Sequence, residues 1–214
     1  MSGKEGIRLF FEIIFGTDMK KGLITILVIA AVALAAFLWV KSVYNSMVTA
    51  DEAVSAAWSQ VENVYQRRAD LIPNLVATVK GYASHEQETL QGVIEARSRA
   101  TQITVDPADL DEESIARFQQ SQGELGSALG RLLALSENYP DLKANENFQD
   151  LQAQIEGTEN RIATERMKYN EAAKKYNTLV RSFPKNIIAS MFDFETKGYF
   201  KASEGAQEAP KVEF

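Results

Sequence analysis

Apolar and polar residues follow a helical period along most of the chain after residue 42. Val54, Ala57 and Val61 lie three and four residues apart, and Trp58 and Tyr65 widen the same stripe. Spacing of this kind places apolar side chains on one face of a helix. The sequence has no period-two run long enough for a strand, so the pattern predicts an all-α protein.

A second apolar stripe repeats every seven residues. Ile162, Tyr169 and Tyr176 keep this spacing, with Ala172 and Leu179 between them. A seven-residue repeat of large apolar side chains is typical of helices that pack as in a coiled coil. We therefore expect coiled-coil-like packing in this part of the chain.

Short breaks divide the helical region into four predicted helices. Glycine or proline marks each end, and Ser, Asp or Asn stands where an N-cap is needed. The marking residues are Gly81, Ser84 with Gln87 (a capping box), Asp106 with Pro107, Pro140 and Asn145. The predicted helices span residues 42–80, 84–104, 108–138 and 144–182. Because short connections make neighbouring helices antiparallel, residues 42–182 are predicted to form an up-and-down four-helix bundle.

The most apolar stretch is residues 22–40, which contains neither a charge nor a proline. At about 1.5 Å per residue it spans roughly 28 Å, close to the hydrocarbon thickness of a bilayer. A cleaved signal peptide would have a shorter apolar core and a small-residue cleavage site. Here Trp39 and Lys41 lead directly into a helical pattern, so residues 22–41 are assigned to a retained transmembrane helix.

Positive charges flank this helix unequally. Lys4, Arg8, Lys20 and Lys21 precede the apolar stretch 22–40, whereas Lys41 is the only basic residue in the 25 positions that follow this stretch. Cytoplasmic flanks carry the excess of Lys and Arg. The charges therefore predict a single-pass protein of the cytoplasmic membrane, with its N-terminus in the cytoplasm and its bundle outside.

Both ends of the chain differ from the central region. Residues 1–21 are either an interfacial helix or a dispensable extension, because their apolar residues share one helical face. Residues 183–201 follow a helix expected to run back toward the membrane, and their aromatics and lysines make Phe192 and Phe200 candidate lipid contacts. The alternative is that these aromatics close the end of the bundle core. Residues 202–214 are polar and predicted to form a disordered tail.

Composition removes several classes of function. The chain has 214 residues, no cysteine, one histidine and a net charge of −6. The absence of cysteine removes disulfides and thiol chemistry, and the negative charge argues against a nucleic-acid partner. His85 lies in a predicted turn, where solvent exposure is the ordinary explanation. We therefore expect a protein that is not an enzyme and that has no metal site and no cofactor.

A charged turn of helix surrounds Pro73. Arg67, Arg68 and Asp70 precede this proline, and the apolar pattern continues on both sides of it. Proline lacks the N–H that would bond the carbonyl four residues earlier, so we expect a kink, with a chain reversal as the alternative. Arg67 and Asp70 can pair locally. The four residues are either a solvated turn or candidate contacts for another subunit or for lipid head groups.

Three glycines share one face of the third predicted helix. Gly123, Gly126 and Gly130 each cost about 1 kcal/mol of helix propensity relative to alanine. They are therefore candidate helix-packing residues. The stripe either admits a helix from a second subunit or packs within the bundle against Trp58 or a tyrosine.

Several long stretches of the chain match one family signature. They are AWSQVENVYQRRADLIPNLVATVKGYASHE, EARSRA, ENYPDLKANENF, LQAQIEGTENRIATERMKYNEAAKKYNTLVRSFP and NIIASMF. On these stretches, residues 19–200 resemble the LemA family of bacterial membrane-anchored proteins. The matching positions include the charged turn of Arg67, Asp70, Pro73 and Asn74, and the paired steps Tyr169-Asn170 and Tyr176-Asn177.

The resemblance implies a helical bundle behind a membrane helix in a bacterial cytoplasmic membrane, and it implies no particular reaction. Some relatives are associated with building intracellular membrane compartments. The family has also been described with a short N-terminus outside, opposite to the orientation that the charges predict.

Two functions of the binding class remain. The first is a membrane-anchored scaffold, whose partners are the lipid bilayer and either a second copy of the chain or another membrane protein. The second is a coiled coil that relays a signal, which predicts a sensory or output domain. The sequence after residue 200 shows no such domain, so the scaffold is favoured. No small-molecule substrate is identified.

Overall fold

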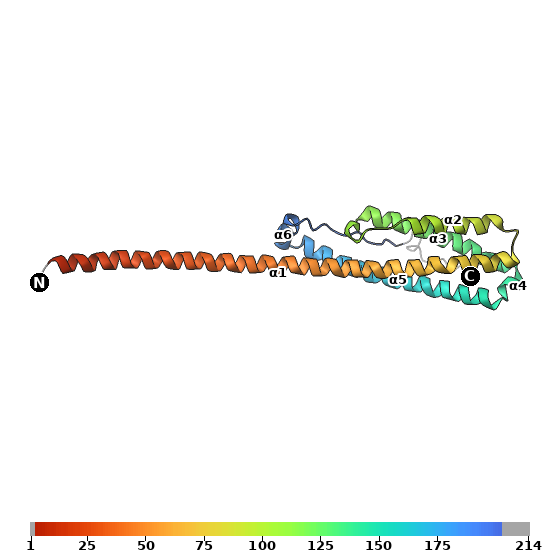
Figure 1. Ribbon diagram of the computed structural model, residues 1–214, viewed down its shortest axis with the longest axis horizontal. Helices are drawn as coiled ribbons and strands as arrows, with labels where there is room; N and C mark the ends of the chain where they lie inside the picture. The colour runs from red at the N-terminus through yellow and green to blue at the C-terminus, as the bar shows by residue number, and fades with distance from the viewer. Residues whose placement is uncertain (1–2, 203–214) are drawn as a thin grey trace, which may run out of the picture. The chain divides into compact units, whose positions relative to one another are not determined.

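The computed structural model describes residues 3–202, with side chains from residue 21 onward. Between residues 3 and 202 the chain forms α- and 3₁₀-helices and no strand, which confirms the all-α prediction. The elements are α1 (Gly3–Tyr82), α2 (Gln87–Gln102), η1 (Pro107–Asp109), α3 (Glu112–Ala134), η2 (Leu135–Asn138), α4 (Pro140–Lys143), α5 (Glu146–Arg181) and α6 (Lys185–Met191) (Figure 1).

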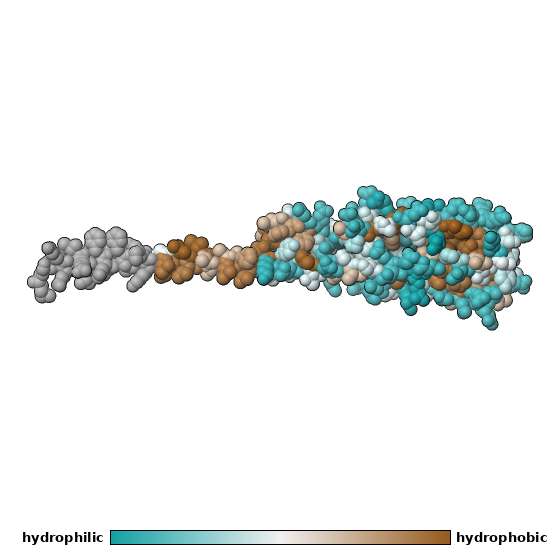
Figure 2. Space-filling view, viewed as in Figure 1, coloured by the Kyte–Doolittle hydropathy of each residue, from teal (hydrophilic) through white to brown (hydrophobic). Residues whose placement is uncertain are grey.

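The chain forms two units, Met1–Ser46 and Met47–Phe214, and α1 belongs to both. In the first unit, residues 22–39 are exposed along their whole length, and Figure 2 shows them as a hydrophobic stretch. The central helix of a soluble protein would bury such side chains. By its length and its apolar composition, the described part of α1 could cross a membrane, and the exposure of these side chains agrees with that. The side chains of residues 1–20 and the whole of 203–214 lie outside the described residues, and with them the predicted interfacial helix and tail.

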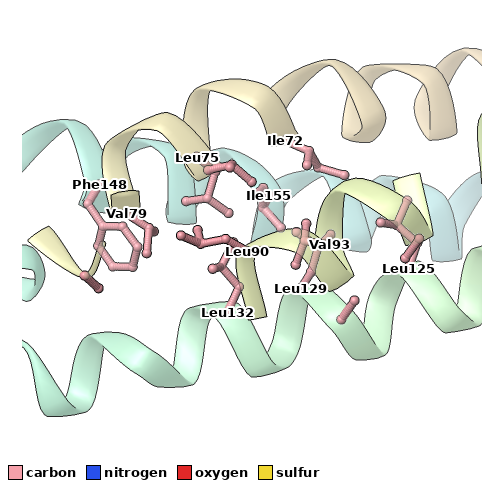
Figure 3. Close-up of a cluster of buried hydrophobic side chains, with 14 of the residues drawn as sticks. Ile72, Leu75, Val79, Leu90, Val93, Leu125, Leu129, Leu132, Phe148 and Ile155 are labelled. Carbon is pink, nitrogen blue, oxygen red and sulfur yellow. The ribbon is translucent and has the colours of Figure 1, made fainter. Parts of the chain in front are cut away.

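In the second unit, the C-terminal part of α1 shares one hydrophobic core with α2, α3, α4 and α5 (Figure 3). Its largest members are Ile72, Leu75 and Val79 of α1, Leu90 and Val93 of α2, Leu125, Leu129 and Leu132 of α3, Leu142 of α4, and Phe148 and Ile155 of α5. Burying one such side chain stabilises the fold by about 1.5–3 kcal/mol. This core fixes the helices that carry the polar residues described below.

Two predicted helix boundaries are correct. α1 continues through Pro73 and Gly81 to Tyr82, so the chain reverses in residues 83–86, just after the glycine, and the alternative reversal at the proline is wrong. α5 begins after Asn145, whose side chain accepts a hydrogen bond from the Phe148 N–H at 3.0 Å, as an N-cap does.

Two predicted helix starts are wrong. α2 begins at Gln87, and the Glu86 side chain makes no capping hydrogen bond, so Ser84 and Gln87 do not form a capping box. Asp106 caps only the short η1, by accepting from the Ala108 N–H at 2.9 Å. α3 starts at Glu112, six residues later than Asp106, and its N-cap is Asp111. In both cases an earlier residue of the right chemical type lies in the turn rather than at the helix end.

The buried stripe of α5 is displaced by one residue from part of the prediction. Tyr169 and Tyr176 are buried as expected, but their neighbours in the core are Ala173 and Val180. Ala172 and Leu179 are only half-buried. After α5 the chain forms α6 and then continues without regular structure from residue 194 to residue 202.

Candidate functional site

A buried arginine lies between three helices of the second unit. Arg68 of α1 is 3% exposed, and its Nη1 is bonded to the Glu159 carboxylate of α5. Its Nη2 donates to both the backbone oxygen and the side-chain Oε1 of Gln122 on α3, at 3.1 and 2.7 Å. The Tyr65 ring lies below the guanidinium, 5.1 Å from its central carbon. A buried charge requires such a set of partners.

Gln122 extends this network to the fourth helix. Its Nε2 donates to the Ala100 carbonyl of α2 at 3.2 Å, so one carboxamide accepts from α1 and donates to α2. In the low dielectric of a core, hydrogen bonds of this kind are strong, and an unpaired partner is costly. The network around Arg68 therefore fixes the register of α1, α2, α3 and α5 against one another.

An open groove of about 830 Å³ lies beside Arg68. Gly123 and Gly126 of α3 line it, together with Arg166 of α5 and Lys201. Its charged side chains have both signs, since Glu112 and Glu159 lie in the same lining. Among the residues that the structure describes, no group of three or more His, Cys, Asp or Glu side chains could hold a metal ion.

Residues 197–201, which we call the return segment, lie against α3 and α5. Asn177 donates to the Lys197 carbonyl and accepts from the Lys197 N–H, both at 2.8 Å. Asn170 holds the N–H and carbonyl of Phe200 in the same way, both at 2.9 Å. Because the two asparagines are seven apart on α5, they lie on the same face of that helix.

A third carboxamide holds the end of the return segment. Gln119 of α3 donates to the Lys201 carbonyl at 3.0 Å and accepts from the Lys201 N–H at 3.1 Å. Arg166 of α5 donates to the same carbonyl at 2.8 Å. Three carboxamides on two helices thus each bind both backbone groups of one residue.

The Phe200 ring occupies an aromatic pocket and is 5% exposed. It stacks on Trp58 of α1 at 5.9 Å and meets the edges of Phe118 and Tyr169 at 6.5 and 5.4 Å. The Arg166 guanidinium lies 4.8 Å from the Phe200 ring centre. Aromatic contacts of this kind contribute about 0.5–1.5 kcal/mol per pair beyond the buried area.

Gly198 passes the start of α3 too closely for any side chain. A Cβ atom at this position would lie 2.6 Å from the Asp111 backbone oxygen. The Gly198 N–H donates to the Leu110 carbonyl at 2.8 Å, and its own carbonyl accepts from the Tyr169 hydroxyl at 3.1 Å. The position therefore requires glycine because of contact with backbone, which cannot move aside as a flexible side chain can.

Lys197 fixes the other end of the return segment. Its Nζ lies 3.2 Å from an Asp51 carboxylate oxygen of α1 and over the Tyr176 ring, 5.8 Å from the ring centre. Burial raises the pKa of Tyr176 to about 12, with the Asp51 charge as a second cause. Burial also raises the pKa of Tyr169 well above its usual value. Both phenols therefore keep their protons to a higher pH than an exposed tyrosine does, and Tyr169 acts as a hydrogen-bond donor.

The residues predicted as contacts around Pro73 differ in their exposure to solvent. Arg67, Asp70 and Pro73 are exposed, so they remain candidate contacts. Arg68 is buried in the network described above, so its prediction as a lipid or partner contact is wrong. Asp70 accepts from Gln66 at 2.7 Å, and the predicted pair with Arg67 is not formed.

Pro73 has a structural consequence that the sequence pattern did not indicate. The Ala69 carbonyl, four residues earlier, accepts from the Arg97 Nε of α2 at 2.7 Å. A residue with an N–H at position 73 would occupy this acceptor within the helix. Proline therefore leaves a helix carbonyl available for a side chain of the neighbouring helix.

The two aromatic candidates differ in exposure, and the three glycines differ in their surroundings. Phe192 is 47% exposed and stays a candidate lipid contact, whereas the burial of Phe200 supports the core alternative. Gly123 and Gly130 have no atom within 4 Å of an added Cβ, and Gly126 faces Arg68 Nη1 at 3.9 Å. Only Gly126 therefore has a close neighbour, the Arg68 guanidinium, which gives no support to packing against Trp58 or a tyrosine; contact with a helix of a second subunit stays a prediction.

Several residues of the site were not predicted as such. Asn170 and Asn177 stood out through the paired Tyr-Asn steps, and their seven-residue spacing was the signal that they share a face. Gln119, Gln122 and Arg97 carried no sequence signal, because their partners are backbone groups far along the chain.

These features define a class of protein: an all-α chain in which the helix carrying an exposed apolar stretch also enters a core with a buried polar centre. A family model described as the LemA family matches residues 57–214. The chain belongs to the LemA family, as the sequence resemblance predicted.

Curated relatives share much of the chain. Magnetosome protein MamQ 2 of Paramagnetospirillum magneticum is 29% identical over 203 residues, covering 87% of this chain and 74% of its own. Magnetosome protein MamQ of Magnetospirillum gryphiswaldense is 26% identical over 192 residues, covering 81% and 71%. Protein LemA of Metamycoplasma hominis is 26% identical over 160 residues, covering 75% and 69%.

Proposed function

We propose that the chain is a non-enzymatic, single-pass scaffold of a bacterial cytoplasmic membrane that assembles with itself or with a membrane protein. The observation that supports this proposal most is that the two parts of α1 have different surroundings. Residues 22–39 are exposed and apolar, whereas from Met47 onward the same helix supplies Trp58, Val61 and Ile72 to a packed core. A helix of this kind can hold a folded unit at a bilayer.

The finer fold that we propose is an up-and-down four-helix bundle with coiled-coil-like packing behind one transmembrane helix. The short connection between α1 and α2 and the seven-residue spacing of buried Ile162, Tyr169 and Tyr176 support it. In such a bundle the helices contribute an extended outer surface, which suits contact with partners rather than enclosure of a substrate.

The polar centre supports a structural role. Arg68 is bonded to Glu159 and Gln122, so its charge is already compensated within the fold. The one histidine, His85, is exposed in the turn after α1. Catalysis needs a positioned nucleophile, acid or base, and the groove beside Arg68 brings together no nucleophile with an adjacent base among the described residues. We propose neither a cofactor nor a small-molecule substrate.

The proposed setting is the organisation of membranes. Two of the relatives are named magnetosome proteins, which associates members of this family with a membrane compartment. The proposed partners are the lipid bilayer and either a second copy of this chain or another membrane protein. The excess of Lys and Arg before residue 22 supports a cytoplasmic N-terminus and an outer bundle.

The unbroken course of α1 is the one observation that favours a signal relay instead. A relay requires a second arrangement of the helices that a ligand or partner favours. Cross-linking between α1 and α5 in membranes, with and without candidate signals, would then give two patterns. A single pattern under all conditions supports the scaffold.

The membrane test is extraction of native membranes with alkaline carbonate and with high salt. The full chain is expected to stay in the membrane pellet under both treatments, because burial of residues 22–39 outweighs peripheral attachment. A matched variant with Ile29→Lys and Val32→Lys places two charges in the apolar stretch, each costing about 2.5–3.5 kcal/mol at a helix centre. Its retention in the membrane pellet is therefore expected to be weaker. Release of the wild-type chain by carbonate would contradict the proposal.

Self-assembly is tested separately, by measuring the mass of the detergent-extracted particle and by cross-linking it. A particle with the mass of one chain plus detergent, and with no associated protein, would contradict the scaffold.

A further inference from the structure

The contacts of the return segment are those of a bound peptide. Side chains of Asn177, Asn170 and Gln119 together satisfy both backbone groups of Lys197, Phe200 and Lys201. Protein clefts that recognise extended peptides use such main-chain bonds for affinity and use side-chain pockets for specificity. We call the surface formed by these three side chains and the aromatic pocket the carboxamide cleft.

The cleft also selects a sequence. The buried Gly198 has no room for a Cβ, and the buried Phe200 fills the pocket formed by Trp58, Phe118 and Tyr169. Lys197 reaches the Asp51 carboxylate, whereas Tyr199 is 40% exposed. The preferred ligand is therefore an extended segment of the form Lys-Gly-x-Phe-Lys, in which the third position is free.

We propose that the carboxamide cleft is a peptide-binding site and that, in the assembled protein, it holds the return segment of a second copy of this chain. The ligand form that the cleft selects is carried by residues 197–201 themselves. The proposal rests on the self-assembly proposed above and identifies the contact that produces it. Each copy then contributes one cleft and one segment to its neighbour.

The proposed exchange requires a change of conformation in the connection before the return segment. Residues 192–196 join the segment to α6, and Asp193 has a φ of 55° within this connection. This backbone conformation is uncommon for residues other than glycine, and aspartate is one of the few that adopt it. A change of backbone conformation in this connection carries the segment out of its own cleft.

Exchange between copies requires no new chemistry. The contacts in the cleft are the same whether the segment comes from the same chain or from a neighbour, as in domain swapping. Chains anchored in one bilayer are also held at a high effective concentration relative to one another. The proposed exchange therefore depends on membrane density and links neighbouring copies.

The first experiment tests the cleft. A chain ending at Thr196 is purified in detergent, and a fluorescent peptide of residues 195–202 is titrated into it. Saturable binding is expected, with affinity at least about tenfold lower for a peptide with Gly198→Ala, because the added methyl group meets backbone. A peptide with Tyr199→Ala is the control and keeps its affinity. Absence of binding to a truncated chain that retains its helical circular dichroism overturns the proposal.

The second experiment tests the exchange on the full chain in membranes. A photoreactive benzophenone side chain at position 199 is expected to give covalent dimers, and Asn170→Leu with Asn177→Leu is expected to remove them. The same photoreactive group at exposed Ser190 of α6 is the control, and the asparagine substitutions should not change its products. Adducts within one chain only would overturn the exchange, even where the extracted particle contains several copies. A single-copy particle would instead contradict the proposed self-assembly. The peptide titration would still show whether the cleft binds the segment. This second experiment also decides the proposal if the truncated chain does not fold.

Discussion

Arg97 of α2 donates its Nε–H to the backbone oxygen of Ala69 on α1 at 2.7 Å. The acceptor is available because Pro73, four residues later, has no N–H to bond it. A proline that interrupts the hydrogen bonding of one helix thus creates the contact that a neighbouring helix uses. The relationship makes the proline and the arginine energetically dependent on each other.

The first prediction concerns this dependence. Arg97→Met is expected to lower the free energy of unfolding by about 1.5–3 kcal/mol, the range for hydrogen bonds to charged groups. In a Pro73→Ala background the loss should be smaller by at least about 0.5 kcal/mol, because the alanine N–H then bonds the Ala69 carbonyl. Pro73→Ala alone should be tolerated. Denaturant titration of the four chains in mild detergent measures the coupling, and equal losses in both backgrounds would contradict it.

The second prediction concerns the ion pair of Arg68 and Glu159. The Arg68 side chain is 4% exposed and the Glu159 side chain 46% exposed. Glu159→Gln is expected to lower the free energy of unfolding by about 1–3 kcal/mol, because it leaves a buried guanidinium short of compensating charge. The matched control is Glu137→Gln, which removes an exposed partner of Lys143 and should cost less than about 1 kcal/mol. Equal effects of the two substitutions would show that Arg68 is solvated.

The third prediction separates the two phenylalanines at the end of the chain. Phe200→Ala is expected to lower the free energy of unfolding by about 3–5 kcal/mol, as expected for a buried aromatic side chain. Phe192→Ala, at a half-exposed position, should cost about 1 kcal/mol or less. Thermal melting of each variant provides the comparison. A Phe200→Ala chain that melts with the wild type would contradict the burial of this ring.

The fourth prediction is a loss of stability at alkaline pH. Burial raises the pKa of Tyr176 from the ordinary value of 10.0 to about 12 and raises that of Tyr169 as well. The folded state therefore favours the neutral phenols, whereas the unfolded chain ionises them near pH 10. The corresponding stability is complete below about pH 10 and is lost as pH rises toward 12. Tyr176→Phe should reduce this dependence. Phenolate absorbance gives the check, since early titration of all seven tyrosines in the folded chain would contradict it.

The fifth prediction concerns orientation in the membrane. The chain has no cysteine, so Ser190→Cys, at an exposed position of α6, introduces a single thiol. With an outer bundle, an impermeant thiol reagent should label this residue in cells whose cytoplasmic membrane is intact. Labelling only after lysis of that membrane would place the bundle in the cytoplasm and reverse the orientation derived from Lys4, Arg8, Lys20 and Lys21.

The sequence by itself determined the helical class, the apolar stretch of residues 22–40 and the family. Each rests on local periodicity or on a continuous run of residues, and a helix buries the side chains that its 3.6-residue period places on one face. The same reasoning predicted the N-cap at Asn145 and the burial of Tyr169 and Tyr176.

The tertiary structure alone decided which polar residues lie inside. Arg67 and Arg68 are adjacent and chemically identical, yet one is exposed and the other is buried between three helices. One residue step rotates a side chain by about 100° around the helix axis, and the partners Gln122 and Glu159 come from helices far along the chain. Likewise, Asn170 binds Phe200 through backbone groups, which are present at every position and leave no trace in a sequence. Contacts of this kind depend on where the folded chain passes, because hydrogen bonds to the backbone do not depend on which side chain the residue carries.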